Sequence, residues 1–396
     1  MKKIIIPILA FTLLLTGCWD IVESEKLGLV TIIGVDISED GNIKFEVQEL
    51  SEQKQSSSSQ GGVPVKAPVK IHKAVAPTIS EAIEKINSSN FHRTYTAHAN
   101  AIILSEELVS SQGIKNIIDY FERTPEIRRN TWLLVSMKGQ FERIFSNSNN
   151  VEAGNDIGKV IKGIIENKTR VSFLTANTLG DFLNLYWETG SQPYTSGISL
   201  IESGADQGSQ AASGSNTGKN YDISIDNTAV FKKDMLAGWL NNEESVGLLL
   251  VLGDIRGGAV TIQYDEKEVL LKMVKVNSNI KPSIKAGKIQ ISVQVKVLVN
   301  VEESHTKLVF ANKQVVSKVE ELLSEEIKKK ILSALDKSRQ LDTDVFGFGN
   351  YIFGSYPKEW KNIEKSGDDY YKSLKINIDV DSTLNQVGLV KLNQRF

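Results

Sequence analysis

Residues 27–50 read LGLVTIIGVDISEDGNIKFEVQEL and predict the β-hairpin from which the first half of the fold is built. Leu27 to Ile37 is rich in Val and Ile, which is typical of a buried strand. Glu39-Asp40-Gly41 indicates a turn because an Asp-Gly pair tolerates positive φ. From Ile43 to Gln48 apolar and polar residues alternate, so we expect a second strand with one apolar and one polar face.

Helices and strands alternate downstream of this hairpin. Thr78-Ile79-Ser80-Glu81 is a capping box that opens an amphipathic helix. Short apolar strands are expected from Ala99 to Leu104 and from Thr131 to Met137. This alternation predicts a mixed α/β N-terminal domain over residues 18–200, with a helical segment at 156–190.

The second half changes character after a Gly/Ser-rich linker at residues 201–220. We expect a middle β-rich domain over 221–264, with the apolar run from Val246 to Leu252 as one of its strands. A C-terminal α+β domain follows over 265–396, in which the amphipathic stretch from Gln314 to Lys337 predicts a long helix packed on a sheet. The fold class is therefore a multidomain α+β protein whose later β regions are mostly antiparallel.

The N-terminus has the order of a secretory signal. Lys2 and Lys3 precede an apolar run of about twelve residues, well short of the ~20 that span a bilayer. The run ends at Leu15-Thr16-Gly17-Cys18, which resembles the bacterial lipobox. We therefore expect residues 1–17 to be a lipoprotein signal peptide and Cys18 to become a diacylglyceryl cysteine that also carries palmitate. The alternative is an ordinary signal peptide with a chance cysteine.

Composition restricts the class of protein. The chain has 396 residues, 41% hydrophobic and 24% charged, which is ordinary for a globular protein. Its formal net charge of −2 becomes more negative when Lys2 and Lys3 are removed, which argues against nucleic-acid binding. Cys18 is the only cysteine, so the lipidated chain has no thiol for a disulfide or a thiolate metal site.

A search for catalytic and metal-binding motifs finds none. The four histidines are not arranged as H-E-x-x-H, and His92 and His98 are badly spaced for one metal ion. The segment from Asp342 to Phe353 starts like a calcium loop but has Phe at two ligand positions, so we expect its aspartates to end a helix and shape a turn. The aromatic residues near 346–360 are expected to pack under the long helix, with a sugar- or partner-binding surface as the alternative. We expect no enzyme activity, no cofactor and no metal.

The chain resembles a known family, the Ger(x)C lipoproteins, which are the C subunits of spore germinant receptors. The matching segments are spread over nearly the whole mature chain: Cys18-Trp19-Asp20, 29–36 (LVTIIGVD), 97–107 (AHANAIILSEE), 125–129 (PEIRR), 228–240 (TAVFKKDMLAGWL), 342–349 (DTDVFGFG) and 356–360 (YPKEW).

The resemblance implies a lipoprotein on the outer face of the spore inner membrane that works with receptor A and B membrane subunits to sense a small nutrient. It implies a non-catalytic role as an accessory and docking subunit. Two alternatives stay open: a solute-binding lipoprotein that captures the nutrient directly, and a lipid-tethered hydrolase of the cell envelope.

Overall fold

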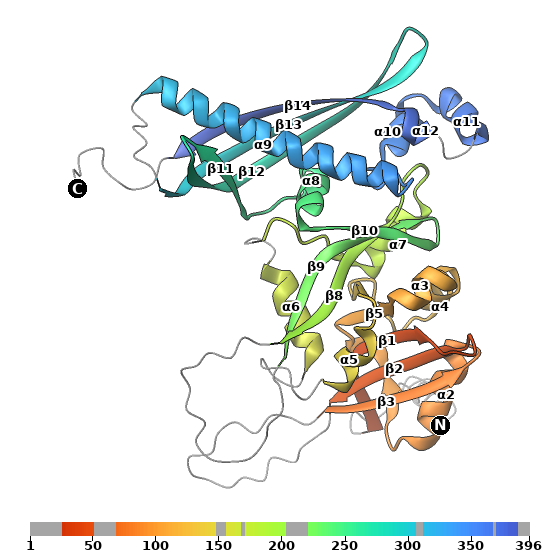
Figure 1. Ribbon diagram of the computed structural model, residues 1–396. Coiled ribbons are helices and arrows are strands. Elements are labelled where there is room, and N and C mark those ends of the chain that lie inside the picture. Colours follow the sequence, from red (N-terminus) through yellow and green to blue (C-terminus); the bar gives the residue numbers. More distant parts are fainter. Residues whose placement is uncertain are drawn as a thin grey trace, which may run out of the picture.

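The structure is a computed structural model (Figure 1). It describes residues 26–50, 69–147, 156–167, 171–202, 221–305, 312–366 and 370–386. Cys18, the signal peptide, the Ser/Gln-rich stretch at 51–62 and nearly all of the expected linker at 201–220 lie outside these residues.

A large mixed sheet organises the first part of the chain. Its ten strands run in the order β10-β9-β8-β6-β5-β1-β2-β3, with β4 paired to β1 and β7 paired to β6. The strands are β1 (Leu27–Ile37), β2 (Ile43–Leu50), β3 (Val69–Ala76), β4 (Arg93–Tyr95), β5 (Ala101–Ser105), β6 (Trp132–Ser136), β7 (Asn177–Thr178), β8 (Tyr194–Glu202), β9 (Tyr221–Lys232) and β10 (Met235–Leu240). The expected hairpin is present as β1 and β2, with Ile37 opposite Ile43.

Helices cover both faces of this sheet. One face packs against α2 (Ile79–Ser89), α3 (Glu106–Ser111), α4 (Lys115–Arg123) and α7 (Leu179–Trp187). The other face packs against α5 (Phe141–Ser146) and α6 (Ile157–Glu166). A short 3-10 helix, η2 (Thr96–His98), precedes β5. Because β1 and β5 lie at the centre, successive residues of both strands are buried on opposite faces.

Strand β2 has one apolar and one polar face, as expected, but its polar face is buried as well. Glu46 is 2% exposed and Gln48 is fully buried. Both side chains point to the face that α5 covers, and both have partners there: Lys44 lies 3.1 Å from Glu46, and Gln48 accepts a hydrogen bond of 3.0 Å from Thr31. The alternation was genuine, but it separated two buried faces rather than an inside from an outside.

The run from Val246 to Leu252 was expected to be a strand and is instead part of helix α8 (Asn242–Leu252). Asn241 begins this helix with a reciprocal capping box, because its side chain accepts from the Glu244 amide at 2.9 Å and its own amide donates to Glu244 at 2.8 Å. From Ser245 to Val251 every residue of this helix is buried, so the apolar run has no polar face to reveal the helical period.

A second sheet forms the C-terminal part, with strands in the order β11-β12-β13-β14. Its strands are β11 (Ala259–Tyr264), β12 (Lys267–Lys285), β13 (Lys288–Ser304) and β14 (Lys375–Gln386). The long helix α9 (Lys313–Gln340) lies along one face of the sheet, as expected, and α10 (Phe348–Ser355), α11 (Pro357–Ser366) and α12 (Tyr370–Ser373) lie at one end (Figure 1). Pairing is antiparallel except for β13 with β14, which is parallel.

The second sheet lies above the first in the view of Figure 1, with α8 between them. The expected α+β class, with later antiparallel strands and a long helix on a sheet, is confirmed. Residues 221–264 contribute strands to both sheets, since β9 pairs with β8 and β11 pairs with β12. The domain boundaries expected from the sequence stay a prediction. None of the described helices is both long enough and apolar enough to span a membrane.

The contact between α8 and α9 yields a stability prediction. A Cβ atom on Gly247 would lie 2.2 Å from the Lys330 backbone oxygen, so Gly247→Ala should lower the free energy of unfolding by about 1–3 kcal/mol. Gly163→Ala on α6 is the matched control, because open space surrounds it and alanine should raise stability by about 0.5–1 kcal/mol through helix propensity. Urea unfolding followed by circular dichroism measures both, and equal stabilisation by the two variants would contradict the close contact.

Candidate functional site

The expected lipidation site, Cys18, lies outside the described residues, but the structure shows where the chain enters the fold. Strand β1 begins at Leu27, which pairs in parallel with Arg93 of β4. At most about nine residues separate Cys18 from this point, so a fully extended chain reaches roughly 30 Å. We call this edge, made of residues 26–28 and 90–93, the β1 end.

A buried carboxylate holds the β1 end together. Glu49 is 1% exposed, and its oxygens accept from Asn90 Nδ2 at 2.9 Å and lie 3.2 Å from His92 Nδ1 and 3.4 Å from His72 Nε2. Gly28 packs directly over it, because a Cβ there would lie 2.3 Å from a Glu49 oxygen. A buried carboxylate is costly unless it is paired, so these contacts fix the segment that follows α2.

Phe91 projects from this fixed segment. Its side chain is 91% exposed, the largest value among the large hydrophobic side chains that the structure describes as exposed. Its neighbours Asn90 and His92 both contact Glu49, and its ring stands edge-on to the His92 ring at 5.0 Å. An aromatic side chain is therefore held outward beside the point where the chain enters the fold.

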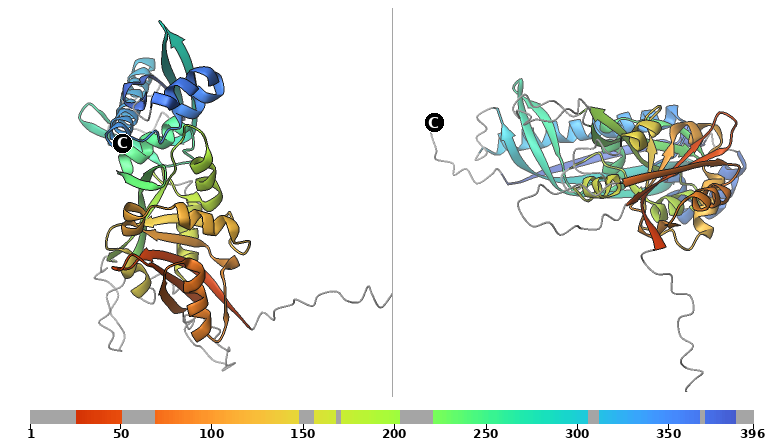
Figure 2. Two further views of the ribbon diagram at one scale, coloured as in Figure 1. Left: turned by 90° about the vertical axis from the view of Figure 1, so that its right-hand side faces the viewer. Right: turned by 90° about the horizontal axis from the view of Figure 1, so that it is seen from below.

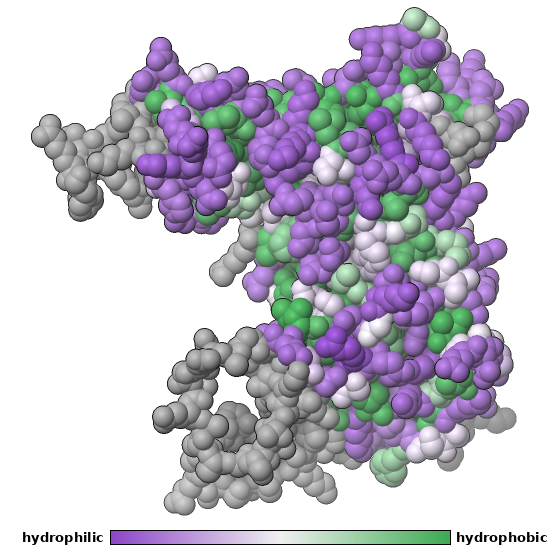
Figure 3. All heavy atoms as spheres, in the orientation of Figure 1, coloured by the Kyte–Doolittle hydropathy of each residue, from purple (hydrophilic) through white to green (hydrophobic). Residues whose placement is uncertain are grey.

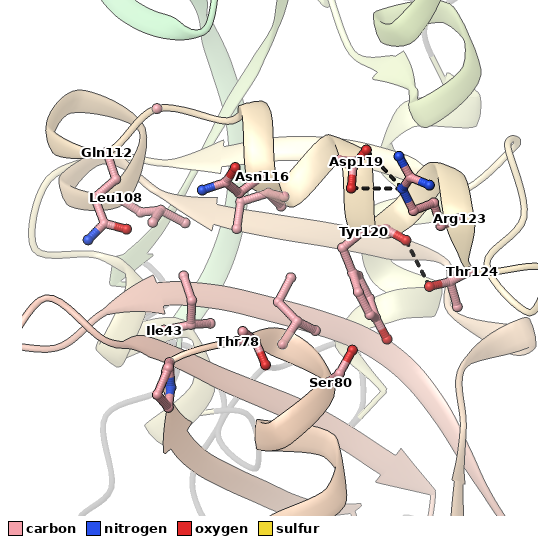
Figure 4. A pocket seen from close by; sticks show the side chains of 14 residues that line it. Ile43, Thr78, Ser80, Leu108, Gln112, Asn116, Asp119, Tyr120, Arg123 and Thr124 are labelled. Atoms are coloured by element: carbon pink, nitrogen blue, oxygen red, sulfur yellow. Dashed lines mark hydrogen bonds and ion pairs between the residues drawn. The ribbon is translucent and has the colours of Figure 1, made fainter.

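A pocket of about 540 Å³ lies between α2 and α4, and we call it the α2–α4 pocket (Figure 4). Apolar side chains supply part of its wall, among them Ile43 from β2 and Leu108 from α3. Polar side chains line the rest: Thr78, Ser80, Gln112, Asn116, Asp119, Arg123 and Thr124. The volume is in the range of small-molecule sites, and the mixed lining suits a ligand with a polar head and an apolar group.

The charged groups of the α2–α4 pocket are already paired with each other. Arg123 Nε donates to both carboxylate oxygens of Asp119 at 2.9 Å, and this bond holds the pKa of Asp119 below its usual range. Burial raises the pKa of Tyr120, whose ring lines the same space (Figure 4). The pocket therefore offers hydrogen-bonding groups and a neutral phenol, without a nucleophile beside a free base.

The segment Asp342-Thr343-Asp344, which sequence analysis assigned to a helix end and a turn, connects the two sheets. Asp342 lies 2.7 Å from Lys232 of β9 and 3.2 Å from Lys372 of α12, and the hydrogen bond with Lys232 is the main reason that its pKa is lowered. Thr343 donates to the Phe231 carbonyl at 2.8 Å. Helix α9 ends at Gln340, so both expectations are confirmed.

Asp344 organises the start of α10. It is 5% exposed and accepts from the amides of Phe348 at 3.1 Å and Gly349 at 2.7 Å, and from the Tyr370 hydroxyl at 2.8 Å. Burial nevertheless outweighs these bonds and raises its pKa to about 6. Perturbed acids often mark active sites, but this one is enclosed by backbone amides and a tyrosine, which identifies it as a structural cap.

Most of the aromatic segment around 346–360 packs into the core, as expected. Phe346, Phe348 and Trp360 are buried, and the first two rings stack at 5.3 Å. Tyr351 and Phe353 are exceptions, at 41% and 40% exposed. Within the described residues, no three His, Cys, Asp or Glu side chains are placed to hold a metal ion.

Comparison with known proteins now places the chain in a family. Residues 20–200 match the family model described as spore germination protein N-terminal domain, and residues 226–388 match the model described as spore germination B3/GerAC like, C-terminal. The chain belongs to this family of spore germination proteins, and the resemblance to the Ger(x)C group is confirmed.

Relatives in Bacillus subtilis (strain 168) resemble the chain over nearly its full length. Spore germination protein KC is 25% identical over 95% of this chain and 93% of the relative. Spore germination protein A3 is 25% identical over 98% and 97%, and spore germination protein B3 is 22% identical over 96% of each. The crystal structure of the GerBC protein has the same fold, with a TM-score of 0.53 and 16% identity over 89% of this chain and 96% of that chain.

The Glu49 cluster was not found from the sequence. Glu49, His72 and His92 lie on three separate elements, and no fixed spacing connects them. The sequence carried only a weak signal for this cluster. Glu49 directly follows Gln48 near the end of the strand, so it breaks the alternation of apolar and polar residues. The expected site residue Cys18 is not tested by the structure and stays a prediction.

The raised pKa of Asp344 predicts a pH dependence of stability. Between its ordinary value of 3.8 and about 6 the folded protein retains a proton that the unfolded chain has lost. Unfolding then releases this proton, so the free energy of unfolding should fall as pH rises through this window, by at most about 3 kcal/mol.

Urea unfolding from pH 4 to pH 7 gives the free energy of unfolding of the unmodified protein and of Asp344→Asn. The contributions of other titrating groups cancel in the difference between the two values. The advantage of the unmodified protein should shrink as pH rises and level off above about 6. Asp381→Asn, at an exposed position on β14, should follow the unmodified protein at every pH. A constant difference across the window would contradict the assignment.

Proposed function

We propose that the protein is the lipid-anchored C subunit of a nutrient germinant receptor, acting on the outer face of the spore inner membrane as a non-catalytic accessory and docking subunit. The observation that carries the proposal is the combination of a lipobox ending in Cys18 with family models that cover both halves of the mature chain. Its relatives are named spore germination proteins, which gives the process but not the subunit's own task.

The geometry of the β1 end supports attachment through Cys18. A diacylated cysteine carries two chains, which is enough for stable membrane binding, whereas one chain gives only marginal binding. Leu27 enters the fold a few residues later, beside the outward-held Phe91. Exposed apolar side chains, phenylalanine among them, can insert into the boundary between the headgroups and the acyl chains of a bilayer. This end of the first sheet therefore faces the membrane in the proposed arrangement.

Two features support a docking role with the receptor A and B subunits. A groove of about 710 Å³ lies where the first sheet meets the C-terminal helices, between Lys115 of α4, Trp187 of α7 and Ile363 of α11. Trp187 is 63% exposed there, and tryptophan is enriched in protein–protein contacts. On the face shown in Figure 3, other hydrophobic residues are scattered among hydrophilic ones, as expected for a surface in water.

Replacing the lipidated cysteine tests the anchor and the role together. Cys18→Ala should move the protein from the membrane to the soluble fraction and abolish the response to nutrients. The matched control Ser24→Ala leaves the lipobox intact and should change neither property. Immunoblots of fractionated spores give the location, and the fall in optical density after nutrient addition gives the response. A normal response from unanchored protein would falsify the proposal.

The α2–α4 pocket favours a second candidate function, direct capture of a nutrient. Under this alternative, calorimetry of the full chain in detergent should show micromolar binding of an amino acid, sugar or nucleoside. Asn116→Trp would obstruct the pocket and remove the heat, whereas Glu84→Trp, on an exposed part of α2 that does not line it, would preserve binding. Absence of heat with every nutrient that triggers the spores would exclude this function.

A further inference from the structure

A small cavity of about 250 Å³ lies where η2, the starts of β5 and β6, and α6 meet, and we call it the basic pocket. Its lining residues are Ala97, His98, Ala99, Asn100, Arg128, Asn130, Trp132 and Lys162. They come from the AHAN and EIRRN stretches and from α6, and nothing in the proposed function uses them. The volume suits a single small polar group rather than a whole nutrient with a large apolar part.

The charge of the basic pocket is one-sided. Arg128 and Lys162 line it, and no carboxylate does. The Arg128 guanidinium has no hydrogen-bond or ion-pair partner among the described residues, and Lys162 Nζ reaches Glu166 only at 3.8 Å. The neighbouring Arg129 differs, because it lies 3.5 Å from Glu122. Arg128 and Lys162 are both exposed and line one open surface pocket, so an anion bound there would be attracted by two positive charges.

Neutral donors complete the lining. The side-chain amides of Asn100 and Asn130 make no hydrogen bond within the described part of the chain, so their N–H groups are available. The His98 ring, which also lines the pocket, lies 5.7 Å from the Tyr95 ring between centroids. A guanidinium, an ammonium and two amides are the groups that bind carboxylate and phosphate oxygens, and the planar guanidinium can hold two oxygens at once.

The basic pocket is built on fixed backbone. The Asn100 amide donates to the Thr31 carbonyl at 2.8 Å, and the Asn100 carbonyl accepts from the Trp132 amide at 3.0 Å. Helix α6 approaches closely because of Gly158, where a Cβ would lie 2.6 Å from the Thr31 oxygen and 3.1 Å from Asn100 Nδ2. The backbone that carries the Asn100 side chain is therefore fixed before any ligand arrives, which lowers the entropy cost of binding.

We propose that the basic pocket is a binding site for a small oxyanion, either a carboxylate-bearing or a phosphate-bearing molecule. Arg128 and Lys162 supply the charge, and Asn100 and Asn130 supply additional hydrogen bonds. The proposal does not depend on lipidation at Cys18 or on the identity of the receptor partners, because it rests only on the lining of this cavity.

Calorimetry of the full lipidated chain in neutral detergent tests the site with inorganic phosphate and with malonate as probes. The neutral diamide malonamide and added sodium chloride control for weak general effects. Saturable heat is expected with at least one anion. Heat with phosphate alone assigns a phosphate ligand, heat with malonate alone assigns a carboxylate ligand, and heat with neither up to about 10 mM overturns the proposal.

Matched variants locate the binding. Arg128→Gln should weaken it roughly tenfold or more, as expected for loss of a hydrogen bond to a charged group. Arg129→Gln removes the same charge one residue away and should have little effect, because that side chain does not line the pocket. Lys162→Gln on α6 gives a second loss that does not rely on the Arg128 variant folding. Equal weakening by Arg128→Gln and Arg129→Gln would overturn the site.

Discussion

The joint between the two sheets depends on three consecutive residues that follow the long helix. Thr343 donates to a carbonyl at the end of β9, and Asp342 makes ion pairs with lysines from both parts of the chain. Asp344 turns the other way and caps α10 with its buried carboxylate. One segment thus fixes the end of α9, the start of α10 and the edge of the first sheet. These bonds couple the two sheets, because moving one sheet relative to the other would break the hydrogen bond from the buried Thr343 hydroxyl to β9 and the ion pair of Asp342 with Lys232.

Burial on both faces of the first sheet explains which parts of the fold could be predicted. The amphipathic helices α2, α6 and α9 were expected, because each has one face toward a sheet and one toward water. Helix α8 was missed because it lies between the sheets and has no face toward water. The burial of the polar face of β2 could not be predicted for the same reason, since α5 covers it and Lys44 there pairs with Glu142. A periodic pattern of apolar and polar residues arises where one face of an element is buried and the other is in contact with water. Helix α8 and strand β2 do not have this contrast.

The candidate sites show a similar division. The chemistry of Cys18 could be predicted because a signal, small residues and a thiol follow one another in the chain. The Glu49 cluster and the basic pocket could not, because each brings together residues from separate strands and helices. The pairing of β4 with β1 and of β5 with β6 brings these residues together. The spacing of residues along the chain does not predict which strands will pair. The matching segments 97–107 and 125–129 indicated that these stretches matter, without indicating that they meet.

The arrangement also orders the molecule relative to a membrane. If Cys18 carries lipid, the few residues before Leu27 hold the β1 end close to the bilayer, and the second sheet stands at the other end of the molecule (Figure 2). Partners that bind in the groove between α4, α7 and α11 would then contact both parts of the chain. Helices α4 and α7 pack against the first sheet, and α11 belongs to the C-terminal part. Because Asp342 and Thr343 connect those parts, a partner bound at the groove would act on both sheets. In the proposed role, this arrangement would hold the partners at a fixed height and orientation above the membrane.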